Sequence, residues 1–131
     1  MAKGYDKHQQ RQADLNAQGR SLARRSKSCC ELCEAKGVSL QPWEVPPVAE
    51  EVDPQRCILL CEKCRKGAEG GALDDPRWKL LSLAVWTELI PVQVVAVRLL
   101  HRLAADGTDW ALSLKDDLYL DPEVQAWVGQ S

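Results

Sequence analysis

Two Cys-x-x-Cys pairs, Cys30/Cys33 and Cys61/Cys64, constrain the fold of this 131-residue chain more than any other feature. The spacing within each pair lets two thiolates wrap one tetrahedral ion, and two such pairs supply four ligands. Four thiolates form the closed shell of a structural zinc site, whereas a catalytic zinc keeps one position open for water. The sequence therefore predicts one structural Zn²⁺ on these four cysteines. Iron in the same cage of four thiolates is chemically possible and stays an alternative.

The six cysteines allow three other interpretations. A disulfide framework is typical of secreted proteins, but the first 20 residues contain no apolar segment of a secretory signal. A redox dithiol usually sits at a strand-to-helix turn with one exposed thiol, and no cysteine here is singled out in that way. Cys29 could replace Cys30 as a ligand, although the two-residue spacer of Cys30 matches the second pair. Cys57 lies in an apolar run and is predicted to be a buried small side chain.

The 27 residues between the two pairs, 34–60, suit a β-hairpin that returns the second pair to the first. Its strands are predicted at 38–45 and 56–60, with an acidic loop that contains a proline between them. A helix interrupted at Gly19 is predicted over residues 6–27. After residue 72 the capping and periodicity signals predict four helices, which start at Asp74-Asp75-Pro76, Pro91, Asp109 and Asp121-Pro122 and carry apolar residues to Trp86, Ala105, Leu118 and Trp127.

These elements predict an α+β protein that forms one compact domain. A basic helical arm is expected at 1–28, a zinc-ribbon or treble-clef module of knuckle, hairpin and knuckle at 29–71, and a helical cap packed on that module at 72–131. No apolar run approaches the roughly 18–20 residues that cross a bilayer. The protein is therefore expected in the cytoplasm and not in a membrane.

Charge is distributed unevenly along the chain. Residues 1–28 carry seven Lys or Arg and two Asp, so this arm has a charge of +5, and the formal net charge of −2 leaves −7 for the rest. An acidic body would repel a phosphate backbone except along the arm, and a solvated helix face explains the arm equally well. Candidate nucleic-acid contacts lie in the arm and on the second knuckle: Lys7, Arg11, Arg20, Arg24, Arg25, Lys27, Lys63, Arg65 and Lys66.

Trp43 and Glu44, in the predicted first strand, are candidates for lining a cleft. Glu44 could act as a catalytic carboxylate, but an acid at the end of a strand is more often a surface residue. The other four tryptophans have core-like spacings and are predicted to pack, which leaves Trp43 as the candidate contact residue. His101 is predicted to lie on a helix surface.

Residues 20–128 resemble the N-terminal zinc-ribbon region of the PhnA family, which is named after a gene of a bacterial alkylphosphonate-uptake operon. The resemblance rests on the paired cysteines, on Trp43-Glu44-Val45-Pro46-Pro47, and on Trp86-Thr87-Glu88 with Pro91-Val92-Gln93-Val94. It implies a zinc-stabilised module from a bacterial cytoplasm. The biochemical role of the family is poorly defined, so the resemblance implies no specific activity.

The order of knuckle, hairpin, knuckle and helix also looks like the treble clef of HNH nucleases. Those enzymes place histidines at the end of the first strand and in the following helix. Here the strand reads Gln41-Pro42-Trp43-Glu44-Val45-Pro46, and Arg65 follows Cys64 where a histidine is usual. This resemblance therefore implies a degenerate module, because the general base and the second metal site of such a nuclease need those imidazoles.

The sequence as a whole predicts a non-catalytic, zinc-stabilised binding or interaction protein with a protein or nucleic acid as partner. Two alternatives stay open. The first is a nucleic-acid-binding protein that uses the basic arm. The second is a hydrolase of phosphonates or phosphoesters, which would require a divalent metal beyond the ion on the four cysteines.

Overall fold

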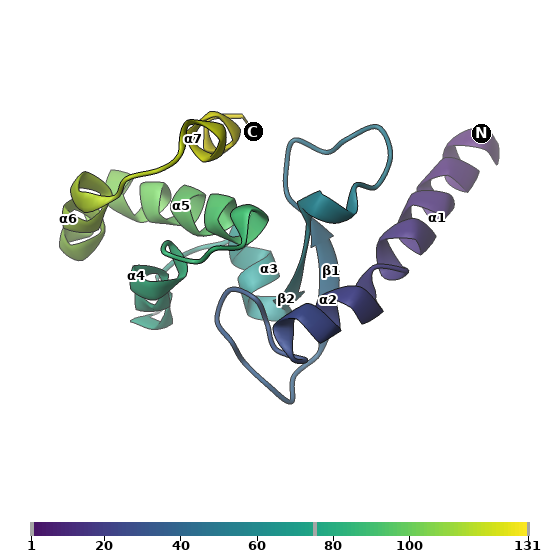
Figure 1. Cartoon of the computed structure of the whole chain (residues 1–131), viewed down its shortest axis with the longest axis horizontal. Coiled ribbons are helices and arrows are strands. Elements are labelled where there is room, and N and C mark those ends of the chain that lie inside the picture. The colour runs from purple at the N-terminus through teal and green to yellow at the C-terminus, as the bar shows by residue number, and fades with distance from the viewer. Residues whose placement is uncertain (1, 75, 131) are drawn as a thin grey trace.

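A computed structural model of the chain describes residues 2–74 and 76–130, with side chains from Lys7 onward (Figure 1). It confirms the predicted α+β class: a two-stranded antiparallel hairpin lies between N-terminal and C-terminal helices. None of the described helices is long and apolar enough to cross a bilayer. The elements are α1 (Ala2–Asn16), α2 (Gly19–Ser26), β1 (Leu40–Glu44), the 3-10 turn η1 (Pro54–Arg56), β2 (Cys57–Cys61), α3 (Glu62–Ala68), the 3-10 turn η2 (Pro76–Leu80), α4 (Leu81–Ala84), α5 (Ile90–Ala105), α6 (Asp109–Asp117) and α7 (Pro122–Val128).

The hairpin pairs β1 with β2 so that Leu40 faces Cys61 and Glu44 faces Cys57. All five residues of β2 are buried, because both faces of the strand are covered. Cys57 and Leu59 pack against Leu22 of α2 on one face, while the alternate residues join the main core with the C-terminal helices on the other. A two-stranded hairpin is marginal by itself in water, so these helices supply most of its stability.

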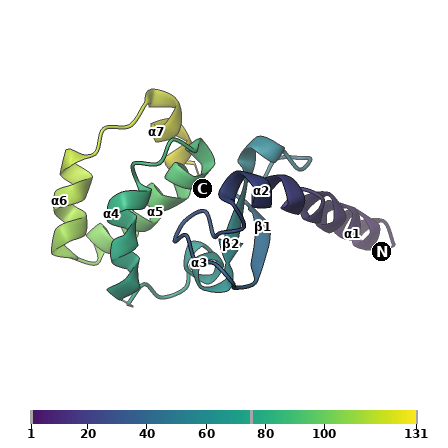
Figure 2. The ribbon, with the colours of Figure 1, turned by 60° about the horizontal axis from the view of Figure 1, so that its bottom comes forward.

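The N-terminal helix is interrupted near Gly19, as predicted: α1 ends at Asn16 and α2 begins at Gly19. The two halves have different surroundings. Helix α2 packs on β2 through Leu22, which is 4% exposed. Helix α1 extends away from the rest of the chain, and its end carries the N-terminus (Figures 1 and 2).

Helix α5 is the centre of the C-terminal half, with ten of its 16 residues buried. Figure 2 shows α4, α6 and α7 gathered around it. Pro91 stands in its first turn, as predicted. The helix ends where Gly107 takes φ +87° and its N–H donates to the carbonyl of Ala104 at 3.0 Å.

The segment before α5 differs from the prediction of one helix. A 3-10 turn, η2, is followed by the single helical turn of α4, and the predicted cap residue Asp75 lies outside the described residues. Trp78 and Leu81 are both buried, and the period of about three residues in a 3-10 turn places them on one face. The prediction that Trp86 packs is wrong: it is 52% exposed, because Val85 takes the core position beside it. Thr108, not Asp109, is the cap of α6.

Candidate metal centre

The first cysteine pair lies in a tight loop after α2. The backbone N–H of Cys30 donates to the carbonyl of Ala35 at 3.0 Å, and the N–H of Glu34 donates back to the carbonyl of Cys30 at 2.8 Å. Glu34 has φ +63°, in the left-handed region, which lets the loop close within so few residues. Cys30 is completely buried, whereas Cys33 keeps partial exposure.

The second pair is placed by the junction of a strand and a helix. Cys61 is the last residue of β2 and the N-cap of α3, and Cys64 lies in the first turn of that helix. Cys64 is completely buried and Cys61 is 6% exposed. The hairpin register therefore fixes where the second pair stands, and the loop of Cys30 and Cys33 lies against it.

The structure brings the four predicted ligands together. Their sulfur atoms all lie within 4.8 Å of one another, and the sulfurs of Cys33 and Cys61 are 3.7 Å apart. Zn–S bonds of about 2.3 Å in a tetrahedron place the sulfurs about 3.8 Å apart, so the cluster fits such an ion with small adjustments. Cys29 does not belong to this cluster, and its Sγ lies 3.4 Å from the carbonyl oxygen of Lys27.

The thiols of the cluster differ in pKa. A hydrogen bond with Cys64 lowers the pKa of Cys30 to about 4, helped by the backbone amides around it and opposed by burial. Burial raises the pKa of Cys33 to about 11, and the same hydrogen bond with Cys30 raises the pKa of Cys64. Because metal ligation needs thiolates, an ion that enters this cluster must release protons from it.

Glu31, between the two cysteines of the first pair, clamps that pair onto β2. Its backbone N–H donates to the carbonyl of Leu59 at 2.8 Å, and its carboxylate accepts from the Leu59 N–H at 2.9 Å. Arg25 donates to both carboxylate oxygens, at 2.8 and 2.7 Å, and to the carbonyl of Cys57 at 3.1 Å. The Glu31 side chain is only 1% exposed. This clamp was not predicted, because no local pattern distinguishes a buried glutamate from a solvated one.

Arg77 brings a positive charge to the cluster. Its Nη2 lies 3.7 Å from the Cys64 sulfur, and its guanidinium stands over the ring of Trp78 at 5.3 Å. Four thiolates with one divalent ion carry a net charge of about −2, so a cation in contact with one sulfur offsets part of it. No periodic pattern in the sequence predicts this contact, since Arg77 lies 13 positions beyond Cys64.

The nine basic candidates fall into two groups. Four form ion pairs within the chain: Arg11 with Glu44, Arg25 with Glu31, Arg65 with Glu69 and Lys66 with Glu62. The other five are exposed, and none forms an ion pair with another described residue: Lys7, Arg20, Arg24, Lys27 and Lys63. Of the four in ion pairs, Arg11 and Arg25 join distant segments of the fold, whereas the pairs of Arg65 and Lys66 are exposed i,i+4 pairs within α3.

Trp43 and Glu44 do not line the same cleft. Successive residues of a strand point to opposite faces, and Trp43 lines a cavity against α5. The Glu44 carboxylate accepts from Arg11 at 2.6 and 3.0 Å on the side of α1. Arg11 also donates to the carbonyls of Ala49 and Glu50, so this pair anchors the loop between the strands.

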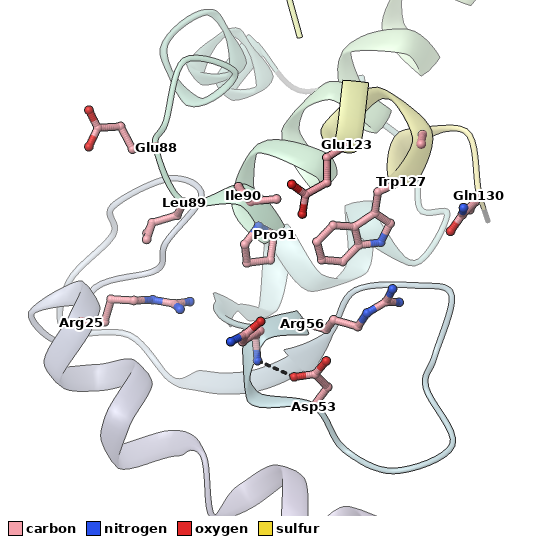
Figure 3. A pocket seen from close by; sticks show the side chains of 12 residues that line it. Arg25, Asp53, Arg56, Glu88, Leu89, Ile90, Pro91, Glu123, Trp127 and Gln130 are labelled. Atoms are coloured by element: carbon pink, nitrogen blue, oxygen red, sulfur yellow. Dashed lines mark hydrogen bonds between the residues drawn. The ribbon is translucent and has the colours of Figure 1, made fainter. Parts of the chain in front are cut away.

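A larger cavity of about 630 Å³ lies between α2, η1, the start of α5 and α7 (Figure 3). Its wall combines two arginines, Arg25 and Arg56, with three acids, Asp53, Glu88 and Glu123. The guanidinium of Arg56 stands over the ring of Trp127, 4.8 Å from its centroid, so its charge already forms a cation–π contact within the chain. Because the wall carries both positive and negative groups, it favours neither an anionic nor a cationic ligand.

Closed coordination by four sulfurs stabilises a fold and offers no position for an activated water. Neither histidine belongs to the cluster that could hold a metal among the described residues. His101 is half-buried rather than on the surface, since it lines the cavity beside Trp43. Comparisons of the chain with models of protein families, with curated proteins and with solved protein structures found no match.

Proposed function

We propose that this protein is a non-catalytic binding protein of the PhnA type whose fold depends on one structural Zn²⁺. The observation that carries the proposal is the cluster of Cys30, Cys33, Cys61 and Cys64, whose sulfurs lie within 4.8 Å of one another. Four sulfur ligands in a tetrahedral arrangement favour zinc or iron over magnesium, calcium or manganese. Cys30, Cys61 and Cys64 are also part of the main core, so the ion would join the hairpin to the helices.

The two groups that could take part in hydrolysis, the ion on the four sulfurs and the Glu44 carboxylate, support a binding role rather than a catalytic one. Four thiolates complete the coordination of the ion, so it cannot activate water for attack on a phosphonate or phosphoester. The Glu44 carboxylate, the candidate general base, is tied to Arg11 and is only 13% exposed. Both of its oxygens already accept hydrogen bonds from Arg11, so the carboxylate is engaged within the fold.

Metal content and coordination test this proposal directly. The reduced, folded protein is expected to contain one zinc per chain, and X-ray absorption should give four Zn–S distances of about 2.3 Å. Replacement of Cys33 by serine should release the ion, whereas Cys29→Ser, the matched control, should keep it. A folded, reduced protein without metal would overturn the proposal, and so would a redox-active iron or a shell that includes oxygen or nitrogen ligands.

Binding of nucleic acid is a second candidate, which one arrangement favours. Arg20 and Arg24 stand four positions apart in α2, so they lie on one helix face, and Lys27 follows as the C-cap of that helix; all three are exposed. Fluorescence anisotropy with a labelled DNA duplex over a salt series tests it. Steeply falling affinity that is lost in Arg20→Gln/Arg24→Gln, but kept in the control Arg65→Gln/Lys66→Gln, would support this candidate. Affinity that does not depend on salt would exclude it.

A further inference from the structure

A second cavity, of about 360 Å³, lies between the hairpin, α3, α5 and α7. We name it the Trp43 cavity. Most of its wall is apolar, with Trp43 on one side and Val95 and Leu99 of α5 on another. Three polar side chains of α5 complete the wall: Arg98, His101 and Arg102. A concave, largely apolar space of this size with a few polar groups is the usual form of a small-molecule site.

Among the described residues, the two arginines of the Trp43 cavity form hydrogen bonds only with backbone carbonyls. Arg98 donates to Pro46 at 2.6 Å and to Val128 at 3.2 Å, and also to the carbonyls of Trp127 and Gln130. Arg102 donates to the carbonyls of Gly67 at 2.7 Å and Gly71 at 2.6 Å. Within the described part of the chain, the cavity wall contains no aspartate or glutamate. Backbone carbonyls carry no full charge, so they orient the guanidinium groups and offset only part of their charge.

The net charge that remains on the two guanidinium groups can be estimated from the helix ends whose carbonyls accept these hydrogen bonds. Except for that of Pro46, the accepting carbonyls lie at or just beyond the C-termini of α3 and α7, and each such helix end is equivalent to about −0.5 of an elementary charge. Two guanidinium groups against two such ends leave about one positive charge uncompensated. Burial, followed by the repulsion of Arg56, lowers the pKa of Arg98, and Lys115 adds to the effect of burial in lowering the pKa of His101. The cavity is therefore positive although most of the chain is acidic.

Arg102 can still bind a ligand. A guanidinium has five N–H groups, and the hydrogen bonds of Arg102 within the described residues use two of them. Its position is fixed by those two bonds, so it would lose little freedom when an anion binds. Trp43, which lines the same cavity, offers an aromatic surface for a flat apolar group.

We propose that the Trp43 cavity binds a small organic anion with a flat apolar body, a carboxylate or a phosphate held by Arg102 and Arg98. The inference rests on the proposed function, because it names the class of ligand that the binding protein would take. Low-dielectric walls and a single sign of charge strengthen the attraction for such an anion and exclude cations of the same shape.

A ligand series on the unaltered, zinc-loaded protein tests the chemistry. The probes are 1-naphthoate, its neutral analogue 1-naphthamide, 1-naphthylmethylamine as the cation, and 1-naphthyl phosphate, each titrated by calorimetry. We expect an anion to bind at least about tenfold more tightly than the amide, the effect of one charge-assisted contact, and no binding of the amine. The tighter of carboxylate and phosphate identifies the head group. Equal affinity of amide and anions, or no binding of either anion at millimolar concentration, would overturn the proposal.

A pair of matched variants tests the location. Ala68→Phe fills the Trp43 cavity and keeps both arginines, and Ala126→Phe makes the same change in the larger cavity. Ala68→Phe should abolish binding and Ala126→Phe should not, while contacts in NMR spectra between the naphthyl ring and Trp43 locate the ligand without any variant. The reverse pattern, or contacts to Trp127 instead, would overturn the location. Metal content measured on the same samples separates this result from failure of the zinc proposal, which a folded metal-free protein would indicate.

Discussion

Replacement of Glu31 by alanine should destabilise the protein by about 2–4 kcal/mol, although Glu31 is neither a metal ligand nor a core residue. The change removes the partner of the Leu59 N–H, which lies in a strand buried on both faces. A buried donor left without a partner costs about 1–3 kcal/mol. The change also removes the ion pair with Arg25, whose side chain is 31% exposed and can return to water. That loss adds about 1 kcal/mol.

Two further substitutions separate these contributions. Glu31→Gln keeps a carbonyl oxygen for the Leu59 N–H and loses only the charge, so we expect a loss of about 1 kcal/mol. Glu44→Ala removes the corresponding ion pair with Arg11. The Glu44 side chain is 13% exposed, and its carboxylate accepts hydrogen bonds from the Arg11 side chain rather than from a strand amide. It should also cost about 1 kcal/mol. The excess of Glu31→Ala over both controls is then the contribution of the Leu59 amide.

Urea unfolding at a fixed excess of zinc, followed by tryptophan fluorescence and far-UV circular dichroism, measures these differences. The same series should show the metal affinity falling with stability in Glu31→Ala, because the metal binds only the folded chain. If Glu31→Ala and Glu31→Gln lose equal stability, the argument from the buried amide is refuted. If Glu31→Ala stays within about 0.5 kcal/mol of the parent protein, the clamp has no energetic role.

Removal of the metal by a strong chelator under reducing conditions should abolish the near-UV circular dichroism, and added zinc should restore it. The reason is that the binding free energy of such sites, on the order of 10–16 kcal/mol, is comparable with the whole stability of a domain. Gly67→Ala should destabilise the protein by about 1–3 kcal/mol in urea unfolding, since a Cβ there would lie 2.4 Å from the Trp78 ring. In the control Gly19→Ala the nearest atom to the new Cβ lies at 3.6 Å, so stability should change by less than about 1 kcal/mol. Burial raises the pKa of Cys57 from 9.0 to about 11. Between these values the unfolded chain loses a proton that the folded chain keeps, so stability should fall by up to about 3 kcal/mol as pH rises. The same denaturation series on Cys57→Ala should lack that part of the fall.

Local patterns predicted the elements that depend on neighbouring residues. The apolar period of α5, with Pro91 in its first turn, and the interruption at Gly19 follow from contacts within one helix. The spacing of the cysteine pairs predicted the ligand set that the structure brings together. The segment from Pro76 to Trp86 was mispredicted as one helix because burial at Trp78 and Leu81 suits a 3-10 turn as well as an α-helix.

Ion pairs between distant segments could not be predicted, because they depend on how the elements pack. Arg11 and Glu44 are separated by 33 positions, and Arg98 joins the loop at Pro46 to the end of α7. In the sequence such residues look like any solvated charge. Composition shows the positive charge of the arm but does not show what that charge contacts. Two of the arm's arginines form ion pairs with acids of the hairpin and of the first knuckle.

The position of strand β2 indicates how one ion on the four sulfurs would order both halves of the chain. The run Cys57-Ile58-Leu59-Leu60-Cys61 shows no polar alternation, because α2 covers one face and the C-terminal core covers the other. Its last residue belongs to the sulfur cluster, and its third is held by the Glu31 clamp. An ion that fixes the end of β2 therefore fixes the register of the hairpin, and a strand slipped by one residue would exchange its two faces. The layers on both sides would then depend on the same four sulfurs, although neither α2 nor α5 supplies one of them.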